Sequence, residues 1–123
     1  MKIIRWVLGR FILLGELLFS PRFAQRTAEA QSAVDLQTRD LVLYQFLTCP
    51  FCVKVRFAMR RLGLHIETRD VRRVPRFREE LLNGGGRIKA PCLRIQEPDG
   101  EVRWMYESTD IIGYLEQRFA ATL

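Results

Sequence analysis

The order of short apolar runs and amphipathic stretches after residue 40 limits the possible fold of this chain more strongly than its composition does. Runs rich in β-formers predict strands, and apolar residues at helical spacing predict helices. The predicted strands are 41–46, 65–71, 91–96 and 102–106. The predicted helices run from Pro50 to about Gly63, from Pro75 to about Leu82, and onward from Ser108. Turns are expected at Asn83–Gly86 and Pro98–Gly100.

This order predicts an α/β domain with a central mixed sheet and helices on both of its faces. The first two strands are joined by a helix, so they should run parallel to each other. A length of 123 residues, 48% of them apolar, suits one domain with its own core.

The cysteine count and the charge limit the functional classes. Three cysteines do not form the framework of a secreted disulfide-rich protein, so a reducing compartment is expected. A net charge of +6 suits an anionic partner of some kind. Arginines crowd residues 69–78, but only Phe77 lies among them, whereas single-stranded nucleic-acid sites interleave aromatic side chains. We therefore expect no nucleic acid and interpret this stretch as a solvated loop and helix entry.

Residues 1–20 are predicted to form an amphipathic helix. At helical spacing one narrow arc holds Lys2, Arg5, Gly9, Glu16 and Ser20. The remaining wide apolar face suits a membrane interface, and the charges within the segment disfavour a spanning helix. A short spanning anchor, a cleaved export signal, and a helix that packs on the protein itself or on a partner remain alternatives.

The domain boundaries follow from these patterns. Ser20-Pro21 should end the first helix, because a residue before proline avoids helical conformation. Residues 21–40 are polar and predict a linker that is helical in part, followed by one domain over 41–123. With an interfacial helix in front of a cytosolic type of domain, we expect the protein at the cytoplasmic face of a membrane.

Cys49 and Cys52 stand where the first strand of the domain passes into its helix. Unpaired N–H groups and the helix dipole lower the pKa of a thiol at such a position. Pro50 suits the first helical turn, and Cys52 follows one turn later, near enough for a disulfide. We therefore predict thiol–disulfide exchange in which Cys49 attacks and Cys52 resolves the mixed disulfide.

Other interpretations of the cysteines stay open. A CxxC pair supplies two of the four ligands of structural zinc, and Cys92 with His65 would complete the set, although their spacing fits no compact zinc finger. We expect no metal. Cys92 itself is expected to be a core thiol, with a third redox centre as the alternative.

Three motifs in the same order resemble the glutaredoxin family. They are Leu43-Tyr44-Gln45-Phe46 leading into Cys49-Pro50-Phe51-Cys52, then Lys89-Ala90-Pro91, then Glu107-Ser108 with Asp110-Ile111-Ile112. The similarity covers about residues 41–120. It is greatest to the glutaredoxin-like domains that form the N-terminal half of glutathione transferases and of membrane-associated prostaglandin E synthases.

The resemblance implies a thioredoxin fold, which is a four-stranded mixed sheet flanked by helices, here with an extra N-terminal amphipathic helix. It also implies a glutaredoxin-type oxidoreductase, active in electron transport, that uses glutathione to reduce glutathione mixed disulfides or protein disulfides. The expected partners are therefore glutathione and proteins that carry a disulfide or a glutathionyl group.

A glutathione site follows from the same resemblance. Pro91 matches the cis-proline that faces the cysteine pair, and the Ala90 backbone would pair with the cysteinyl part of glutathione like an added strand. Glu107 and Ser108 match the pair that holds the γ-glutamyl end. Ser108 would cap the last helix, whose N–H groups accept the γ-glutamyl carboxylate, and Glu107 would take the ammonium group.

The other end of glutathione and the flanks of the site have weaker candidates. Arg87 and Lys89 would hold the glycine carboxylate. Pro50, Phe51 and Tyr44 would lie beside the sulfur atoms, although Tyr44 also suits the core.

The sequence departs from the family pattern in two respects, and two other functions are alternatives. Many glutaredoxins carry a lysine shortly before the cysteine pair, whereas residues 45–48 here contain none. Because this sequence stops at Leu123, without a helical second domain, we expect no transferase activity of that kind. The alternatives are an iron–sulfur or metal carrier and a non-catalytic adaptor that recruits a partner through residues 1–40.

Overall fold

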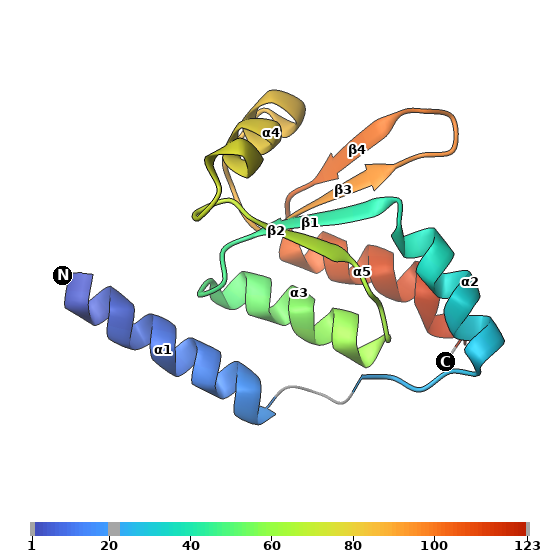
Figure 1. The fold of residues 1–123 in the computed structure, drawn as a ribbon, viewed down its shortest axis with the longest axis horizontal. Coiled ribbons are helices and arrows are strands. Elements are labelled where there is room, and N and C mark those ends of the chain that lie inside the picture. Colours follow the sequence, from blue (N-terminus) through green and yellow to red (C-terminus); the bar gives the residue numbers. More distant parts are fainter. Residues whose placement is uncertain (1, 20–22, 123) are drawn as a thin grey trace.

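In the computed structural model, which describes residues 2–19 and 23–122, the helices and strands follow the predicted order (Figure 1). The strands are β1 (Leu41–Gln45), β2 (Glu67–Asp70), β3 (Cys92–Gln96) and β4 (Val102–Met105). The helices are α1 (Lys2–Phe19), α2 (Ala28–Thr38), α3 (Pro50–Arg61), α4 (Pro75–Gly85) and α5 (Ser108–Phe119), followed by a 3₁₀ turn at Ala120–Thr122. The second strand is shorter than the predicted 65–71, and the others match within two residues.

The four strands form one mixed sheet in the order β2-β1-β3-β4. β1 and β2 are parallel, as predicted, while β1 with β3 and β3 with β4 are antiparallel. Tyr44 pairs with Cys92, and Gln45 pairs with Asp70. The carboxyl ends of β1 and β2 therefore lie beside the start of β3, and the loops that follow them share one edge of the sheet.

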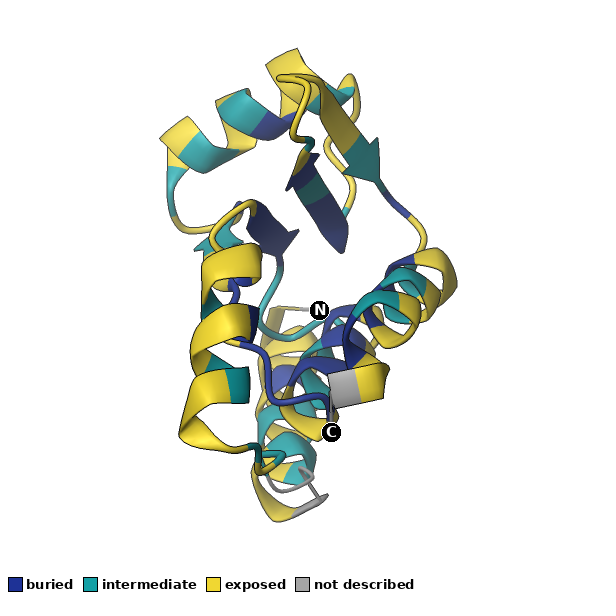
Figure 2. Cartoon of the chain, turned by 90° about the vertical axis from the view of Figure 1, so that its right-hand side faces the viewer, coloured by how far each residue is buried: buried dark blue, intermediate teal, exposed yellow. Residues whose placement is uncertain are grey.

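Two layers of helices cover the sheet, as the sequence predicts. The larger core cluster joins one face of the sheet to α2, α3 and α5, and the smaller cluster joins the other face to α4 (Figure 1). Buried positions concentrate on the central strands β1 and β3 and on the helix faces that meet them (Figure 2). Tyr44 is fully buried in the smaller cluster, where its hydroxyl donates to Glu80 at 2.9 Å and accepts from Arg69 at 3.1 Å.

The helix α4 is longer than the sequence predicts, because glycines that were expected to form a turn belong to it. It continues to Gly85 and ends at Gly86, whose φ of 89° is left-handed. A Cβ at Gly84 would lie 2.1 Å from the Trp104 ring, and one at Gly85 would lie 1.9 Å from the Tyr106 hydroxyl. These glycines let α4 approach β4 closely rather than breaking the helix.

The segment predicted as a linker contains α2, which packs on the core. Thr27 caps this helix through the Ala30 N–H at 3.2 Å, and Val34 is buried against the larger cluster. Arg26 donates to the carbonyls of Gly63 and Phe119, at 3.1 Å each. The predicted helix end at Ser20-Pro21 lies outside the described residues.

The first helix, α1, lies beside α3 (Figure 1) and meets the domain through its polar arc. Gly9 is buried, and Glu16 pairs with Arg56 of α3. Most apolar side chains point outward, with Ile3 77% and Leu17 78% exposed, whereas Ile12 is half-buried. Over residues 2–19 and 23–122, we find no helix that combines the length and the apolar character required to cross a bilayer.

Candidate active site

The predicted site residues lie at the sheet edge where the strand ends meet. Cys49 follows β1, Pro91 immediately precedes β3, and Glu107 follows β4. Because β1 neighbours β3 and β3 neighbours β4, the backbone brings these three segments together. Residues far apart in the sequence thus share one edge, as in many α/β sites.

Cys49 occupies the N-cap position of α3, as the sequence predicts. Its carbonyl accepts from the Val53 N–H at 3.0 Å, while its side chain makes no capping hydrogen bond. The residue is half-buried, and it lines a pocket of about 340 Å³. Pro50 holds the first helical position, and the adjacent Phe51 is 57% exposed. A sulfur in this position is open to small disulfides and faces the unpaired N–H groups of a helix start.

Cys52 lies beneath Cys49 and is fully buried. Its Sγ accepts from the Phe46 N–H at 3.4 Å. Burial, followed by a hydrogen bond and charge interaction with the Cys49 sulfur, raises the pKa of Cys52 to about 12. At neutral pH Cys52 is therefore a thiol, and the two side chains are in contact as the CxxC spacing predicts.

Arg56 holds the loop between β1 and the cysteines, although no sequence motif marks it. Its guanidinium donates to the Gln45 side chain and to the Leu47 carbonyl, at 2.8 Å each. It also donates to both oxygens of Glu16, at 2.6 and 2.7 Å. The only available signal was a carboxylate at Glu16 within an apolar segment, which requires a partner when it is shielded from water.

The helix α1 forms one wall of the pocket that holds Cys49, in line with the alternative of a first helix that packs on the protein itself. Arg5, Leu8 and Ile12 line that pocket from α1. Gly9 permits the close approach, since a Cβ there would lie 3.0 Å from the Thr48 side chain. The predicted narrow polar arc exists, but it faces the domain.

The Ala90-Pro91 peptide bond is cis, as the resemblance implies. Pro91 is buried and Ala90 is half-buried. Next to them, the Lys89 ammonium lies 3.1 Å from Glu107 Oε1. These two side chains were expected at opposite ends of glutathione, yet here they form one exposed ion pair.

The predicted cap of the last helix is shifted by one residue. Glu107, not Ser108, holds the N-cap position of α5, and its side chain makes no capping bond. Ser108 is the first helical residue and is half-buried. The α5 N–H groups thus lack a side-chain acceptor from Glu107, whose carboxylate pairs with Lys89 instead.

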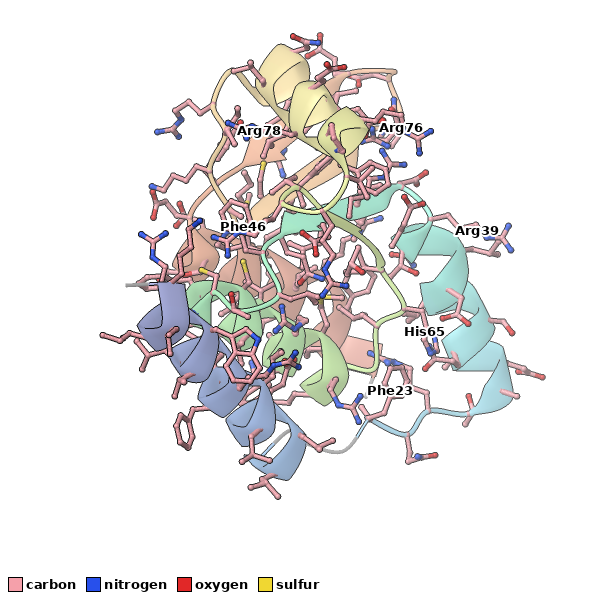
Figure 3. The ribbon with its side chains drawn as sticks, turned by 60° about the vertical axis from the view of Figure 1, so that its left-hand side comes forward. Phe23, Arg39, Phe46, His65, Arg76 and Arg78 are labelled. Carbon is pink, nitrogen blue, oxygen red and sulfur yellow. The ribbon has the colours of Figure 1, made fainter. Side chains whose placement is uncertain are left out.

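The remaining candidates lie in the core or apart from the sulfur atoms. Burial raises the pKa of Cys92 to about 12, and the residue is fully enclosed, as expected for a core thiol. The Arg87 guanidinium stacks over the Tyr106 ring at 4.5 Å. His65 stacks on Phe23 at 4.6 Å, well away from Phe46 in Figure 3, so it does not complete a zinc set with the cysteines. Residues 2–19 and 23–122 hold no cluster of three metal-ligating side chains.

Comparison with known proteins agrees with this geometry. Residues 43–122 match the family described as the N-terminal domain of glutathione S-transferase. None of the curated protein sequences matches the chain. Glutathione transferase Omega 3C from Trametes versicolor is 19% identical with a TM-score of 0.55, and the similarity covers 81% of this chain and 43% of that one. At this identity the similarity concerns the fold alone.

Two further solved structures are similar over shorter or looser superpositions. Maleylacetoacetate isomerase from Anaeromyxobacter dehalogenans 2CP-1, with bound GSH, is 26% identical over 65% of this chain and 38% of that one, with a TM-score of 0.49. Glutaredoxin C1 from Populus tremula x tremuloides is 16% identical over 73% of this chain and 88% of that one, with a TM-score of 0.48.

The present chain therefore spans less than half of the transferase and of the isomerase. The family match covers most of the chain from β1 onward and leaves α1 and α2 outside it. Together with the mixed sheet, the cis-proline and the cysteine at the start of α3, this match shows that the chain belongs to the family of glutathione S-transferase N-terminal domains, with a glutaredoxin-like thioredoxin fold.

Proposed function

We propose that this protein is a glutathione-linked thiol–disulfide oxidoreductase that reduces glutathione mixed disulfides. The observation that carries the proposal is the pairing of a half-exposed Cys49 at the start of α3 with a buried Cys52 in contact with it. The attacking species in disulfide exchange is a thiolate, and the sulfur that attacks must be accessible to the disulfide.

The reaction takes place in two balanced steps. The Cys49 thiolate attacks the glutathione sulfur of a mixed disulfide, so that a Cys49–glutathione disulfide forms and the protein thiolate leaves and takes a proton from water. A second glutathione thiolate then attacks the glutathione sulfur on Cys49. This releases glutathione disulfide and restores the Cys49 thiolate, so both electrons come from glutathione.

The burial of Cys52 favours this monothiol route over resolution by Cys52. A thiol whose pKa is about 12 is almost wholly protonated at neutral pH, and only a thiolate attacks a disulfide. We infer that Cys52 acts as a slow resolving group, used when glutathione is scarce.

The Lys89–Glu107 pair suits the γ-glutamyl end of glutathione, which carries an ammonium and a carboxylate on one carbon. Glu107 would accept from the ammonium, while Lys89 and the free N–H groups at the start of α5 would face the carboxylate. The Ala90 backbone would pair with the cysteinyl part. We therefore assign Lys89 to this end rather than to the glycine carboxylate.

The test is turnover of the mixed disulfide of glutathione and 2-mercaptoethanol. Cys49→Ser should abolish turnover, whereas Cys52→Ser should keep most of it. Equal loss in both variants would indicate a dithiol route without glutathione and would contradict the proposal. Glu107→Gln should raise KM for glutathione with little change in kcat, and Arg39→Gln, directly after the distant α2 (Figure 3), serves as the control.

We also propose that the outward face of α1 rests on a membrane surface. This face gathers exposed apolar side chains, among them Ile3, Phe11 and Leu17, with arginines at its edge. Apolar area with flanking basic residues binds the interface of anionic bilayers.

Sedimentation with vesicles that contain anionic lipid tests this second proposal. Phe11→Glu should abolish binding of the protein to the vesicles. Leu36→Glu places the same charge at an exposed apolar position of α2 and should leave binding unchanged. Failure of the wild-type protein to sediment with the vesicles would contradict the proposal.

A further inference from the structure

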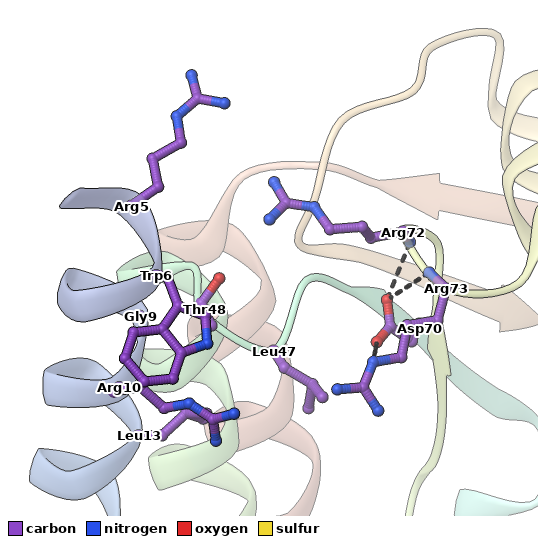
Figure 4. A pocket seen from close by; sticks show the side chains of 10 residues that line it. All are labelled: Arg5, Trp6, Gly9, Arg10, Leu13, Leu47, Thr48, Asp70, Arg72 and Arg73. Carbon is purple, nitrogen blue, oxygen red and sulfur yellow. Dashed lines mark hydrogen bonds and ion pairs between the residues drawn. The ribbon is translucent and has the colours of Figure 1, made fainter. Parts of the chain in front are cut away.

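A cationic cleft separates α1 from the loops that follow β1 and β2 (Figure 4). Its volume is about 260 Å³. Arg5, Trp6 and Arg10 line it from α1, and Asp70, Arg72 and Arg73 line it from the opposite side.

The arginines of this cleft carry more charge than the protein neutralises. Asp70 lies 3.7 Å from Arg73 Nε, and its other oxygen accepts the backbone N–H groups of Arg72 and Arg73 at 2.9 and 3.2 Å. Within the described residues, no carboxylate forms an ion pair with Arg5, Arg10 or Arg72. The Arg10 and Arg72 guanidinium groups instead lie over the rings of Trp6 and Phe46, at 5.1 Å each. A surface with unneutralised guanidinium groups attracts carboxylates.

The cleft adjoins the pocket that contains Cys49. Arg5, Gly9, Thr48 and Arg72 line both of them. A molecule whose sulfur reaches Cys49 can therefore extend along α1 between the two rows of arginines.

The cleft and the proposed glutathione contacts lie on opposite sides of β1. Arg72 and Arg73 follow β2, on one side of β1, whereas Ala90 and Glu107 belong to segments beside β3 and β4, on the other side. The α1 wall also lies outside the residues that match the family. This cleft is thus a feature that the chain adds to its family fold.

The spacing of the arginines indicates the form of the ligand. They stand along two facing walls and do not converge on one point (Figure 4), so a single compact anion would meet only some of them. An extended chain with several carboxylates matches both rows.

We propose that this cleft binds an acidic peptide segment of the protein whose glutathione mixed disulfide is reduced at Cys49. The inference rests on the proposed oxidoreductase function and names its substrate class. α1 then acts as a specificity element, because it supplies one of the two charged walls beside the reacting sulfur.

The test compares two glutathionylated peptides of equal length, one with glutamates and one with glutamines around the modified cysteine. For the wild-type protein at low salt we expect kcat/KM to be about tenfold higher for the glutamate peptide, since several exposed ion pairs contribute modestly each. Arg10→Gln and Arg72→Gln, on opposite walls, should each lower this ratio about threefold. The readout is a ratio of two kcat/KM values, so a change in Cys49 reactivity affects both peptides equally and cancels. The two arginines lie on different walls, so a local folding defect at one of them would not explain the same loss in both variants.

Controls separate this inference from the proposals on which it depends. Arg39→Gln should keep the full ratio, and salt should reduce the ratio in the wild-type protein. A ratio near one in the wild-type protein would overturn the cleft assignment while leaving turnover of the small mixed disulfide intact. Loss of turnover with the small disulfide would instead overturn the oxidoreductase proposal. If Arg10→Gln and Arg72→Gln abolish binding to anionic vesicles but leave the peptide ratio unchanged, the arginines serve a lipid surface and the inference is wrong.

Discussion

The helices α5 and α1 are both amphipathic, yet they face the domain with opposite sides. α5 buries Ile111, Leu115 and Phe119 completely against the larger core cluster. α1 turns its apolar side to the surroundings and meets the domain through Gly9 and Glu16. An amphipathic pattern alone therefore does not say which side of a helix packs on the protein.

The two contacts depend on different interactions. The position of α5 follows from burial of nonpolar area, which is insensitive to moderate salt. The position of α1 depends on the pair of Glu16 and Arg56, whose side chains are 20% and 13% exposed, and on the contact of Gly9 with Thr48. A partly exposed ion pair contributes less than the burial of a whole apolar helix face, and it weakens with salt. We expect α1 to open far more readily than α5.

The largest expected effect on stability comes from weakening the apolar contact between α5 and the core. Leu115→Ala should lower the free energy of unfolding by ~2–5 kcal/mol, because it leaves a cavity in the core. Leu18→Ala, at an exposed position of α1, should change it by no more than ~0.5 kcal/mol. Urea denaturation of both variants measures the free energy of unfolding. Equal losses in the two variants would contradict the conclusion that α5 and α1 contact the domain through different interactions.

Alkaline pH should act on the core and spare α1, which contains no cysteine. The folded-state pKa values of Cys52 and Cys92 are raised from 9.0 to about 12, chiefly by burial. Between these values the unfolded chain releases protons that the folded protein retains. Each thiol should therefore lower the free energy of unfolding by ~1.4 kcal/mol per pH unit above pH 9.0.

Urea denaturation between pH 7 and pH 10.5 measures this slope, and Cys92→Ala should make it shallower. A slope that is the same with and without Cys92 would show that this thiol titrates alike in the folded and unfolded states.

A smaller effect is expected from the ion pair that holds α1. Glu16→Gln should raise the equilibrium constant for opening of α1, equivalent to ~1–2 kcal/mol, since Arg56 keeps its contacts with Gln45 and the Leu47 carbonyl. Hydrogen exchange of the amides in 2–19 reports this opening. Glu116→Gln removes the more exposed pair with Arg61 and should leave exchange in α1 unchanged. Slow exchange of α1 in the Glu16 variant would show that something other than this pair holds the helix.

The smallest effect distinguishes two glycines of α1. Gly9→Ala adds a Cβ 3.0 Å from Thr48 and should speed hydrogen exchange in α1 by loosening its contact. Gly15→Ala meets no atom within 4 Å and should slow that exchange, since alanine favours helix over glycine by up to ~1 kcal/mol. The same sign of change in both variants would mean that the close approach at Thr48 is unimportant.

Much of the fold and the centre of the site were predictable from local patterns. Short apolar runs marked β1 and β3, and the CxxC motif marked the start of α3, because strand burial and helix entry depend on neighbouring residues. The boundaries of α4 and α5 were less predictable. Gly84 and Gly85 stay helical because the rings of Trp104 and Tyr106 lie against them, and those rings are distant in the sequence.

The contacts around the site join residues that are far apart in the sequence. No local pattern joins Glu16 to Arg56, 40 residues away, or Lys89 to Glu107, 18 residues away. The sequence alone predicts Lys89 and Glu107 at different ends of glutathione and indicates no partner for Glu16. Their pairing depends on how the elements pack, which local periodicity does not describe.

The sequence by itself determined the order of strands and helices and the placement of Cys49 and Cys52 at the start of α3, because both follow from the spacing of residues within a few turns. Only the tertiary structure decided which side of α1 meets the domain. A helix is oriented by the neighbours available to it, and here Arg56 pairs with Glu16 while the Thr48 side chain lies against Gly9.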